Sequence, residues 1–475
     1  MLKNIKKVFI SFILLLFSAC AVGRDYIKPS IETPSKFDAE SSKDFTKEIV
    51  DTSWWKYFED KTLSKLVEDA VKGNKDIEQA LSRVNQSRAL LKEAYAKFLP
   101  TTSAGFVGQD VKNHATGTIR QMPISDNDLF AASADASWEI DIFGKLRRNV
   151  EMQKATLHAT TASLYDATRI LVADVANVYF SLRSYQEQLA IAKKNIETQQ
   201  ETLEIVTAKF LAGQVSELDK VRAETQLEAT KSITPPLETA IQVNMHRLAV
   251  LCGKYPNELE KELSLWEPLK IYNGPVIISD AENLLKTRPD IMMAERNLAA
   301  ATALIGVNKA DYFPRFSISG SLSLKTDDLS KLFHNGMQSS FGPSITWTPL
   351  DFGQIRARVK ASEERVGEAL SKYESTILRA FEDVENSLTA FSAERRRYAM
   401  LKKTFELSEK AYLLAKDQYK EGVLDFISVL TAQGDMLNNE NNLCKSKERL
   451  NSSIVSIYKA LGGGWEAWQL VEDKK

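Results

Sequence analysis

One cysteine near the start of the chain lies where a lipid could be attached to it. Three lysines precede a ten-residue, nearly all-apolar stretch, 8–17, and two small residues then lead to Cys20. This layout predicts an export signal that is removed as residues 1–19, because the apolar stretch is too short for a transmembrane helix. The residues Phe17-Ser-Ala-Cys20 resemble a lipobox, in which the thiol receives a diacylglycerol. We expect a diacylglycerol and an N-acyl chain on Cys20; an ordinary signal peptide with an incidental cysteine is the alternative.

The rest of the sequence lacks the residue patterns of common enzymes and metal sites. No Walker A loop, HExxH motif or nucleophile elbow occurs. Three cysteines and four scattered histidines cannot make a disulfide scaffold or a zinc module. Lys plus Arg number 62 and Asp plus Glu 63, which argues against nucleic acid as a partner. With 44% hydrophobic residues the chain is not disordered. We therefore expect neither an enzyme nor a protein with a cofactor or metal in a binding site.

Two glycines are placed to reverse the chain between helices. Gly213 is followed three residues later by Ser216, and Gly422 by Asp425. Glycine adopts the positive φ that ends many helices, and Ser or Asp caps the helix that follows. A plain helical turn is the minimal interpretation. The sequence predicts turns over 213–219 and 422–427.

The segments around these turns belong to an internal sequence repeat. Trp138–Arg147 recurs as Trp347–Arg356, with Gly144 and Gly353 offset by 209 residues. The other anchors pair Lys209–Gly213 with Gln418–Gly422 (209), Leu251–Gly253 with Leu461–Gly463 (210), and Phe98-Leu-Pro100 with Tyr312-Phe-Pro314 (214). Four anchors in one order indicate an internal tandem duplication. The predicted divisions are an N-terminal segment 20–73, repeat 1 over 74–261, a linker 262–287, repeat 2 over 288–464 and a tail 465–475.

Each copy contains a stretch long enough for one very long helix. Residues 145–212 contain neither Gly nor Pro, and residues 354–421 contain only Gly367. Both stretches are rich in helix-forming residues, and their apolar residues recur at steps of three and four, as in coiled-coil seams. Each helix would be roughly 100 Å long, and its many charges would keep it out of lipid.

Each copy also contains a predicted β-hairpin, between a shorter helix that ends at Pro100 or Pro314 and the long helix. Residues 315–325 alternate apolar and polar without a break. The hairpins are predicted over about 101–140 and 315–348, with strand lengths that suit transmembrane strands. A soluble hairpin with one buried face is the alternative. Four strands cannot close a sheet in lipid, because their edges would stay unpaired, so the sequence predicts an obligate oligomer.

A set of residues and motifs spread over almost the whole mature chain is shared with a known family. It consists of Cys20–Pro29, Trp54-Trp55, Phe58, Asp60, Asn74, Asp76, Trp138–Arg147, Arg288–Ile291, Phe313-Pro314 and the two glycine turns. With these residues the chain resembles the TolC-like outer-membrane efflux channels in their NodT-type lipoprotein branch.

The resemblance implies a mainly α fold with a small β part, a trimeric α/β-barrel channel-tunnel. Four strands per chain would contribute to a shared twelve-stranded barrel, with coiled-coil-like helices in the periplasm. Residues 37–73, the chain ends and Gly462–Trp465 would form an equatorial belt.

The same resemblance implies a function, a compartment and partners. The expected protein is a lipid-anchored homotrimer of the cell outer membrane that extends into the periplasm. It would be the passive exit channel of a tripartite, RND-type efflux system for small molecules such as drugs. A periplasmic adaptor and an inner-membrane RND or ABC transporter would be its partners. The exit duct of a type I protein secretion system and a non-conducting periplasmic structural lipoprotein remain alternatives.

The resemblance also assigns roles to the turns. The adaptor-facing residues would be Gly213, Ser216, Leu218, Asp219, Gly422 and Asp425. Ile427 would form an apolar constriction at the periplasmic gate, unless it packs between neighbouring helices. Thr431 stands where the family usually has an acid, and Gly434 where it has a basic partner, so these positions depart from the charged ring that the resemblance implies. Asp435 would provide charge nearby, although a step of one residue turns it about 100° from Gly434.

Two further features distinguish the copies. Pro235 and Pro236 have no counterpart in the second copy, so we expect the first return helix to be kinked or interrupted there and the second to run on. Cys252 and Cys444 are not in equivalent positions, and we expect them to be packing thiols rather than a disulfide.

Overall fold

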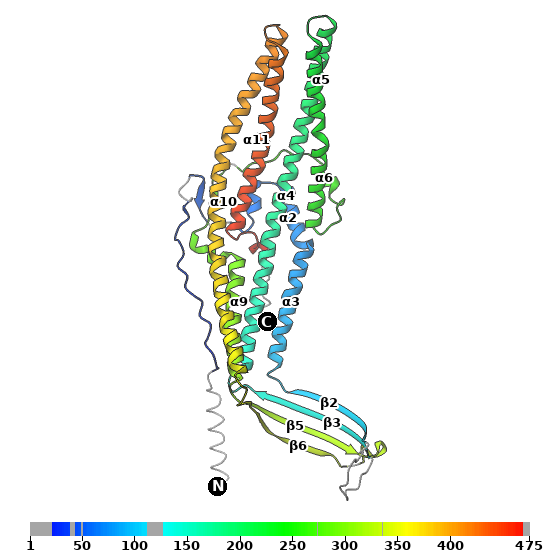
Figure 1. The fold of residues 1–475 in the computed structure, drawn as a ribbon, viewed down its shortest axis with the longest axis vertical. Coiled ribbons are helices and arrows are strands. Elements are labelled where there is room, and N and C mark those ends of the chain that lie inside the picture. The colour runs from blue at the N-terminus through cyan, green and yellow to red at the C-terminus, as the bar shows by residue number, and fades with distance from the viewer. Residues whose placement is uncertain are drawn as a thin grey trace. The chain divides into compact units, whose positions relative to one another are not determined.

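A computed structural model describes residues 21–38, 43–48, 51–111, 127–272, 274–334 and 336–468. The predicted signal peptide and Cys20 lie outside the described residues. Ten α-helices and six strands are assigned within them (Figure 1). The helices are α2 Lys61–Gly73, α3 Lys75–Ala96, α4 Lys145–Leu211, α5 Glu217–Ser232, α6 Thr234–Leu251, α7 Glu260–Leu263, α8 Leu284–Thr287, α9 Pro289–Ala310, α10 Gln354–Lys420 and α11 Phe426–Ala460. The strands are β1 Phe45–Lys47, β2 Thr101–Val111, β3 Asn127–Ile140, β4 Val276–Ile278, β5 Arg315–Thr326 and β6 Gln338–Thr346.

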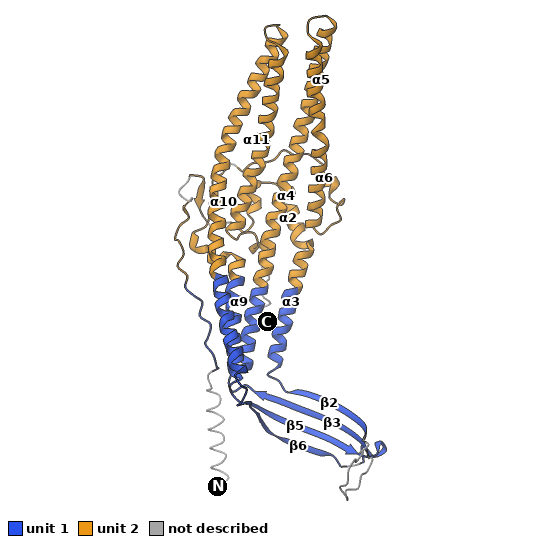
Figure 2. Ribbon diagram, in the orientation of Figure 1, with its two compact units in different colours: residues 1–30, 83–160, 293–373 blue, residues 31–82, 161–292, 374–475 orange. Residues whose placement is uncertain are grey.

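Two compact units make up the chain, and their boundaries differ from those of the predicted repeats (Figure 2). The first unit holds residues 1–30, 83–160 and 293–373, and the second holds 31–82, 161–292 and 374–475. Each unit therefore takes segments from both copies of the repeat. A single helical hairpin or β-hairpin buries too few apolar residues to be stable alone. Corresponding segments of the two copies therefore pack together and form one shared hydrophobic core.

The first unit contains a four-stranded antiparallel sheet in the order β2-β3-β5-β6. Its two hairpins, β2–β3 and β5–β6, come one from each copy, and the pairing of β3 with β5 joins them. The observed hairpins lie within the predicted ranges, although β6 ends at Thr346 and leaves Trp347 outside the strand. The outer strands β2 and β6 have no further strand partner among the described residues.

The long helices follow the prediction closely. α4 and α10 each contain 67 residues and end one residue before the predicted ends. The shorter helices α3 and α9 end at Ala96 and Ala310, before the prolines at which we expected them to stop. A residue that precedes proline is driven out of the helical conformation, so the last helical turn must end earlier. No described helix has the length and apolar composition needed to cross a bilayer.

The first return helix is interrupted and the second is not, as predicted. α5 ends at Ser232 and α6 begins at Thr234 with Pro235 and Pro236 in its first turn. Proline lacks an amide proton and is tolerated there, where no helical bond is required of it. α11 has no proline and continues for 35 residues.

The second unit fixes the far end of α11 with arginines and aromatic rings. Arg288 donates to the Ala460 carbonyl oxygen at 2.9 Å, and its guanidinium also bonds both carboxylate oxygens of Asp290. Arg169 donates to the carbonyl oxygen of Lys459. These cations satisfy the last carbonyl groups of α11 and complement the negative end of its dipole. The Arg288–Ile291 motif therefore anchors a helix end.

Aromatic residues from the N-terminal segment pack onto the same end of α11. Trp54 stacks on Tyr458 with ring centroids 5.5 Å apart, and Trp55 stacks on Trp468 at 5.1 Å. Tyr165 stacks on Trp465 at 4.4 Å. The structure thus buries parts of the predicted belt, namely Trp54, Trp55 and Phe58 from its first segment and residues 462–465 from its last.

The two described cysteines are buried and free. The Cys252 thiol lies 3.6 Å from the Leu66 carbonyl oxygen, and the Cys444 thiol lies 3.6 Å from that of Ser184. Burial raises the pKa of Cys252 to about 11 and that of Cys444 to about 12, so both remain neutral thiols. They pack as small apolar side chains, which agrees with the prediction.

Candidate functional site at the helical tips

Both helical hairpins reverse through a glycine in the left-handed region. Gly213 has φ +72° and Gly422 has φ +78°. The amide of Gln214 donates to the Lys209 carbonyl oxygen at 2.9 Å, and the amide of Val423 does the same to Gln418. These bonds close the helix ends in Schellman geometry. No atom lies within 4 Å of a side chain added at either glycine, so backbone conformation rather than space requires glycine there.

The helices that follow the turns are capped by the two residues that the sequence indicated. Ser216 caps α5 in a capping box with Asp219, whose carboxylate returns to the Ser216 amide at 3.2 Å. Asp425 caps α11 and accepts from the Ser428 amide at 3.1 Å. Hydrogen bonds from Ser428 hold the pKa of Asp425 below its usual value, so this cap stays ionised. Each capped helix begins at a fixed residue, which sets the direction of every later side chain.

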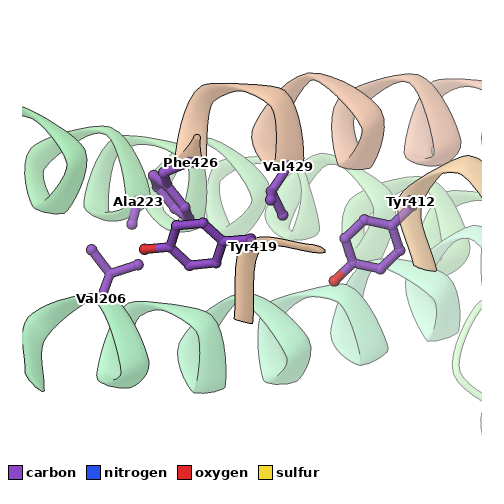
Figure 3. Packing of buried hydrophobic residues seen from close by; sticks show 6 residues of the cluster. All are labelled: Val206, Ala223, Tyr412, Tyr419, Phe426 and Val429. Atoms are coloured by element: carbon purple, nitrogen blue, oxygen red, sulfur yellow. The ribbon is translucent and has the colours of Figure 1, made fainter. Parts of the chain in front are cut away.

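Six buried residues, here called the tip cluster, hold the two hairpins against each other just behind the turns (Figure 3). The ring of Tyr419 lies between Val206 and Phe426, and its centroid is 5.4 Å from that of Phe426. The ammonium of Lys209 lies 4.2 Å from the Tyr419 ring centroid and covers that ring. Phe426 is therefore buried at the start of α11, and the next residue must point elsewhere. The cluster contains Val206 of α4, Ala223 of α5, Tyr412 and Tyr419 of α10, and Phe426 and Val429 of α11.

The residue after Phe426 lines an open groove between α10 and α11, here called the tip groove. Its volume is about 720 Å³. Ile427 is 44% exposed, so within one chain it does not pack between helices. The hydroxyl of Thr431 donates to the Ile427 carbonyl oxygen at 2.9 Å and is not free to bind a solute strongly. Its lining includes Thr404, Leu407 and Ala411 of α10 and Ile427, Thr431 and Asp435 of α11.

Asp435, one residue and about 100° past Gly434, lines the tip groove together with Ile427 and Thr431. Steps of four residues advance by only about 40° around a helix, so residues 427, 431 and 435 form one stripe. Gly434, where a basic partner was sought, is not part of the groove lining. The groove thus has an apolar residue, a hydroxyl and a carboxylate at successive helical turns.

The residues predicted to face a partner lie at the tips, and most of them are exposed. Gly213, Ser216, Gly422 and Asp425 are exposed, whereas Asp219 is half-buried by its cap. Leu218 is 56% exposed. The sequence reasoning missed two further apolar side chains at the tips, Leu211 and Val423, which are 80% and 71% exposed. The available signal was their position in the sequence, since Leu211 stands two residues before Gly213 and Val423 directly follows Gly422.

Within the described ranges, no three or more His, Cys, Asp and Glu side chains are grouped as a metal site would require. Ser216, Asp219 and Asp425 are engaged in helix caps, and Thr431 and Asp435 line the tip groove. Their arrangement can form a contact surface and narrow a passage.

Comparison with known proteins identifies the family. The family model described as outer membrane efflux protein matches residues 66–254 and 281–463. Nodulation protein T of Rhizobium leguminosarum bv. trifolii is 30% identical over 455 residues, with 96% of each chain covered. The toluene efflux pump outer membrane protein TtgI of Pseudomonas putida is 28% identical over 469 residues, covering 96% of this chain and 98% of its own length. The solved outer-membrane channel OprN is 34% identical with a TM-score of 0.87, and the match covers 94% of this chain and all of OprN. The chain therefore belongs to the outer membrane efflux protein family and is an outer-membrane exit channel of a tripartite efflux system.

Proposed function

We propose that three copies of this chain surround one passive duct for small molecules, and that the tip-groove stripe of each copy narrows its periplasmic end. The observation that supports this proposal most directly is the half-exposed Ile427 in the first turn of α11. This helix is capped at one end by Asp425 and held at the other by Arg288. In the duct an apolar ring of Ile427 excludes water and ions without any charge.

The two residues that follow on the stripe give the constriction its chemistry. The Thr431 hydroxyl is bonded to its own helix, so Thr431 adds only a weakly polar ring. Asp435 adds a carboxylate two helical turns behind Ile427. A ring of carboxylates attracts cations and repels anions at the mouth of a pore. The closed tip is therefore an apolar barrier followed by a cation-attracting ring.

The unpaired edges of the sheet support the shared barrel. β2 and β6 each expose a row of backbone donors and acceptors that lipid cannot satisfy. If β6 of each copy pairs with β2 of the next copy, no strand edge stays unpaired once the copies form a closed ring.

The start of the mature chain supports a lipid on Cys20. The Val22 amide donates to the Phe143 carbonyl oxygen at 3.0 Å, and Arg148 donates to the carbonyl oxygens of Val22 and Gly23. Phe143 follows the end of β3, so Val22, two residues after Cys20 in the sequence, is held beside the strand ends. A diacylglycerol attached two residues before this point in the sequence would reach the membrane in which the strands lie.

The exposed apolar side chains at the tips support docking to a periplasmic adaptor. Leu211, Leu218 and Val423 are large, exposed and grouped around two rigid turns. Burying such groups against a partner is favourable by about 25 cal/mol per Å². The adaptor in turn connects the duct to an inner-membrane RND or ABC transporter.

The proposal is tested by entry of a large antibiotic into cells that carry only a variant channel. In cells that lack the adaptor, Ile427→Ala and Ile427→Ser should raise vancomycin entry and Thr431→Ala should raise it less. Val423→Ser, at the same tip but outside the groove, should leave it unchanged there, because no docking takes place. Thr431→Asp should create a titratable ring that attracts cations. Native mass measurement of each variant checks that three chains remain together. Unchanged entry in the Ile427 and Thr431 variants, with the particles intact, would place the gate elsewhere.

A further inference from the structure

One phenylalanine in the first unit is almost fully exposed in the part of the chain that the structure describes. Phe352, between β6 and α10, is 97% exposed and has φ +50°. Among the described residues only Glu59 shares this left-handed conformation without being glycine. Such a conformation costs energy for a bulky residue, and a fully exposed aromatic ring adds no packing in return.

The equivalent residue in the first copy is packed. Phe143 stands 209 positions before Phe352, and each directly precedes the glycine of its repeat motif. The Phe143 ring stacks on Phe313 with centroids 4.5 Å apart and an interplanar angle of 20°. By the offset of 214 residues the equivalent of Phe313 is Leu99, which is 65% exposed. The packed pair joins repeat 1 to repeat 2, whereas both members of the equivalent pair are uncovered.

The repeat offsets hold in three dimensions as well as in the sequence. Within the first hairpin Thr101 lies opposite Ser137, and adding 214 and 209 gives Arg315 opposite Thr346, the observed pair of the second hairpin. A side-chain contact repeats too. The Trp138 indole donates to the Phe98 carbonyl oxygen at 2.8 Å. Its counterpart, from the Trp347 indole to the Tyr312 carbonyl oxygen, is 3.1 Å long.

The pairing between the two repeats therefore predicts the pairing between two copies. β3 of repeat 1 pairs with β5 of repeat 2, and Ser137 lies opposite Ser319. Adding 209 to Ser137 gives Thr346 of β6, and subtracting 214 from Ser319 gives Gly105 of β2. The repeat therefore places Thr346 opposite Gly105. Each of these strands has only one strand partner among the described residues, so the contact is expected to be made with another copy.

We propose that Phe352 packs on Leu99 of the partner subunit, and that β6 pairs with β2 of that subunit in the register that sets Thr346 opposite its Gly105. The proposal rests on the proposed assembly of three copies and specifies which residues meet. Covering Phe352 buries the exposed ring, and the partner contact holds its left-handed backbone in place.

Charge makes the contact between copies different from the contact within a chain. Inside the chain Asp311 bonds the Lys145 ammonium and also Arg315 and Arg358. By the same offsets the equivalents of Asp311 and Lys145 are Lys97 and Gln354. The ion pair is not repeated, so the contact between copies depends on strand pairing and on the apolar pair. Phe352 should therefore matter for assembly.

Cysteine pairs test the register. Ser344 and Val107 are opposite in the proposed pairing, because their equivalents Asp135 and Ser321 are opposite within the chain. After oxidation in membranes, S344C combined with V107C should give a ladder of covalent dimers and trimers. The matched controls combine S344C with G105C or Q109C, which keep the strand face but shift the register by two residues. They should give clearly less product.

Three outcomes oppose the inference in different ways. Equal or stronger cross-linking by a shifted pair refutes the register. Absence of cross-linking by every pair, in particles whose native mass shows three chains, refutes the β6–β2 contact while the proposed trimer stands. Native mass that shows only monomers refutes the trimer and the inference with it.

The contact of Phe352 is tested by the temperature at which detergent dissociates the assembled particle. F352A should lower this temperature, and L99F, which restores an aromatic pair, should raise it. The gain from L99F should vanish in the F352A background, because residues in contact show coupled effects. F333A is the control, since Phe333 is also exposed, at 82%, and belongs to the β5–β6 loop. Additive effects of F352A and L99F would refute the contact.

Discussion

Truncating Phe426 should loosen the closed tip by an amount that follows from its packing. Its side chain is 3% exposed and belongs to the tip cluster, which contains residues from both hairpins. Phe→Ala at such a site costs about 3–5 kcal/mol, because apolar contacts are lost and a cavity is left. The helices continue far beyond the tip, so Phe426→Ala should lower the free energy of local opening rather than unfold the particle.

Hydrogen exchange measures this local opening directly. Every 1.4 kcal/mol is a factor of about ten, so 3 kcal/mol predicts roughly 100-fold faster exchange in the first turns of α11, residues 428–436. Val423→Ala is the matched control, because Val423 is 71% exposed on the neighbouring turn and should change exchange little. Since Ile427 is the next residue, leak through the channel should rise as well. Unchanged exchange in Phe426→Ala would refute the role of the tip cluster in holding the gate.

Three further outcomes are expected. Burial opposes ionisation of Asp290, but hydrogen bonds and charge from Arg288 outweigh it and hold the pKa of Asp290 below its usual value. The stabilisation that ionised Asp290 contributes is therefore complete above about pH 4 and is lost as the pH falls through the lowered pKa. Asp290→Asn should make the unfolding temperature decrease less steeply with falling pH, measured in thermal unfolding followed by circular dichroism. A decrease as steep as that of the wild type would contradict this. Cys20→Ala should abolish incorporation of radioactive palmitate while the protein still reaches the outer membrane, and persistent label would refute lipidation of Cys20. Asp435→Asn should reduce the preference of the open channel for cations, measured as a reversal potential in a salt gradient, and an unchanged potential would place Asp435 outside the conducting path.

The elements of this fold are predictable because they depend on local residue patterns. The absence of Gly and Pro over 145–212 predicted α4 to within a residue, and the alternation in 315–325 predicted β5. Gly213 and Gly422 located the reversals because only glycine adopts their positive φ without strain. Ser216 and Asp425 located the helix starts because their side chains bond the first free amides.

The arrangement of the site depends on contacts that no local pattern specifies. Phe426 and Ile427 are adjacent and both apolar, and only the packing of Tyr419 decides which of them is buried. The α10 wall of the tip groove, with Leu407, depends on the register between two helices, which the tip cluster sets. Two steps of four residues from Ile427 place Asp435 on the same side of α11. The sequence interpretation instead compared Asp435 only with its neighbour Gly434.

The compact units could not be read from the repeats for a related reason. Tandem copies suggest two units in sequence order, but corresponding segments of both copies pack side by side. The exposed Phe352 was equally invisible in the sequence, where it looks like the packed Phe143.

Single-channel recording of the purified particle in planar bilayers tests the central claim most directly. The account predicts that the wild-type particle conducts through a mostly closed channel, that Ile427→Ser raises its basal conductance, and that Val423→Ser does not. Native mass in the same preparation should show three chains for each protein. A three-chain particle that never conducts, or an Ile427→Ser particle with wild-type conductance, would contradict a duct closed at Ile427.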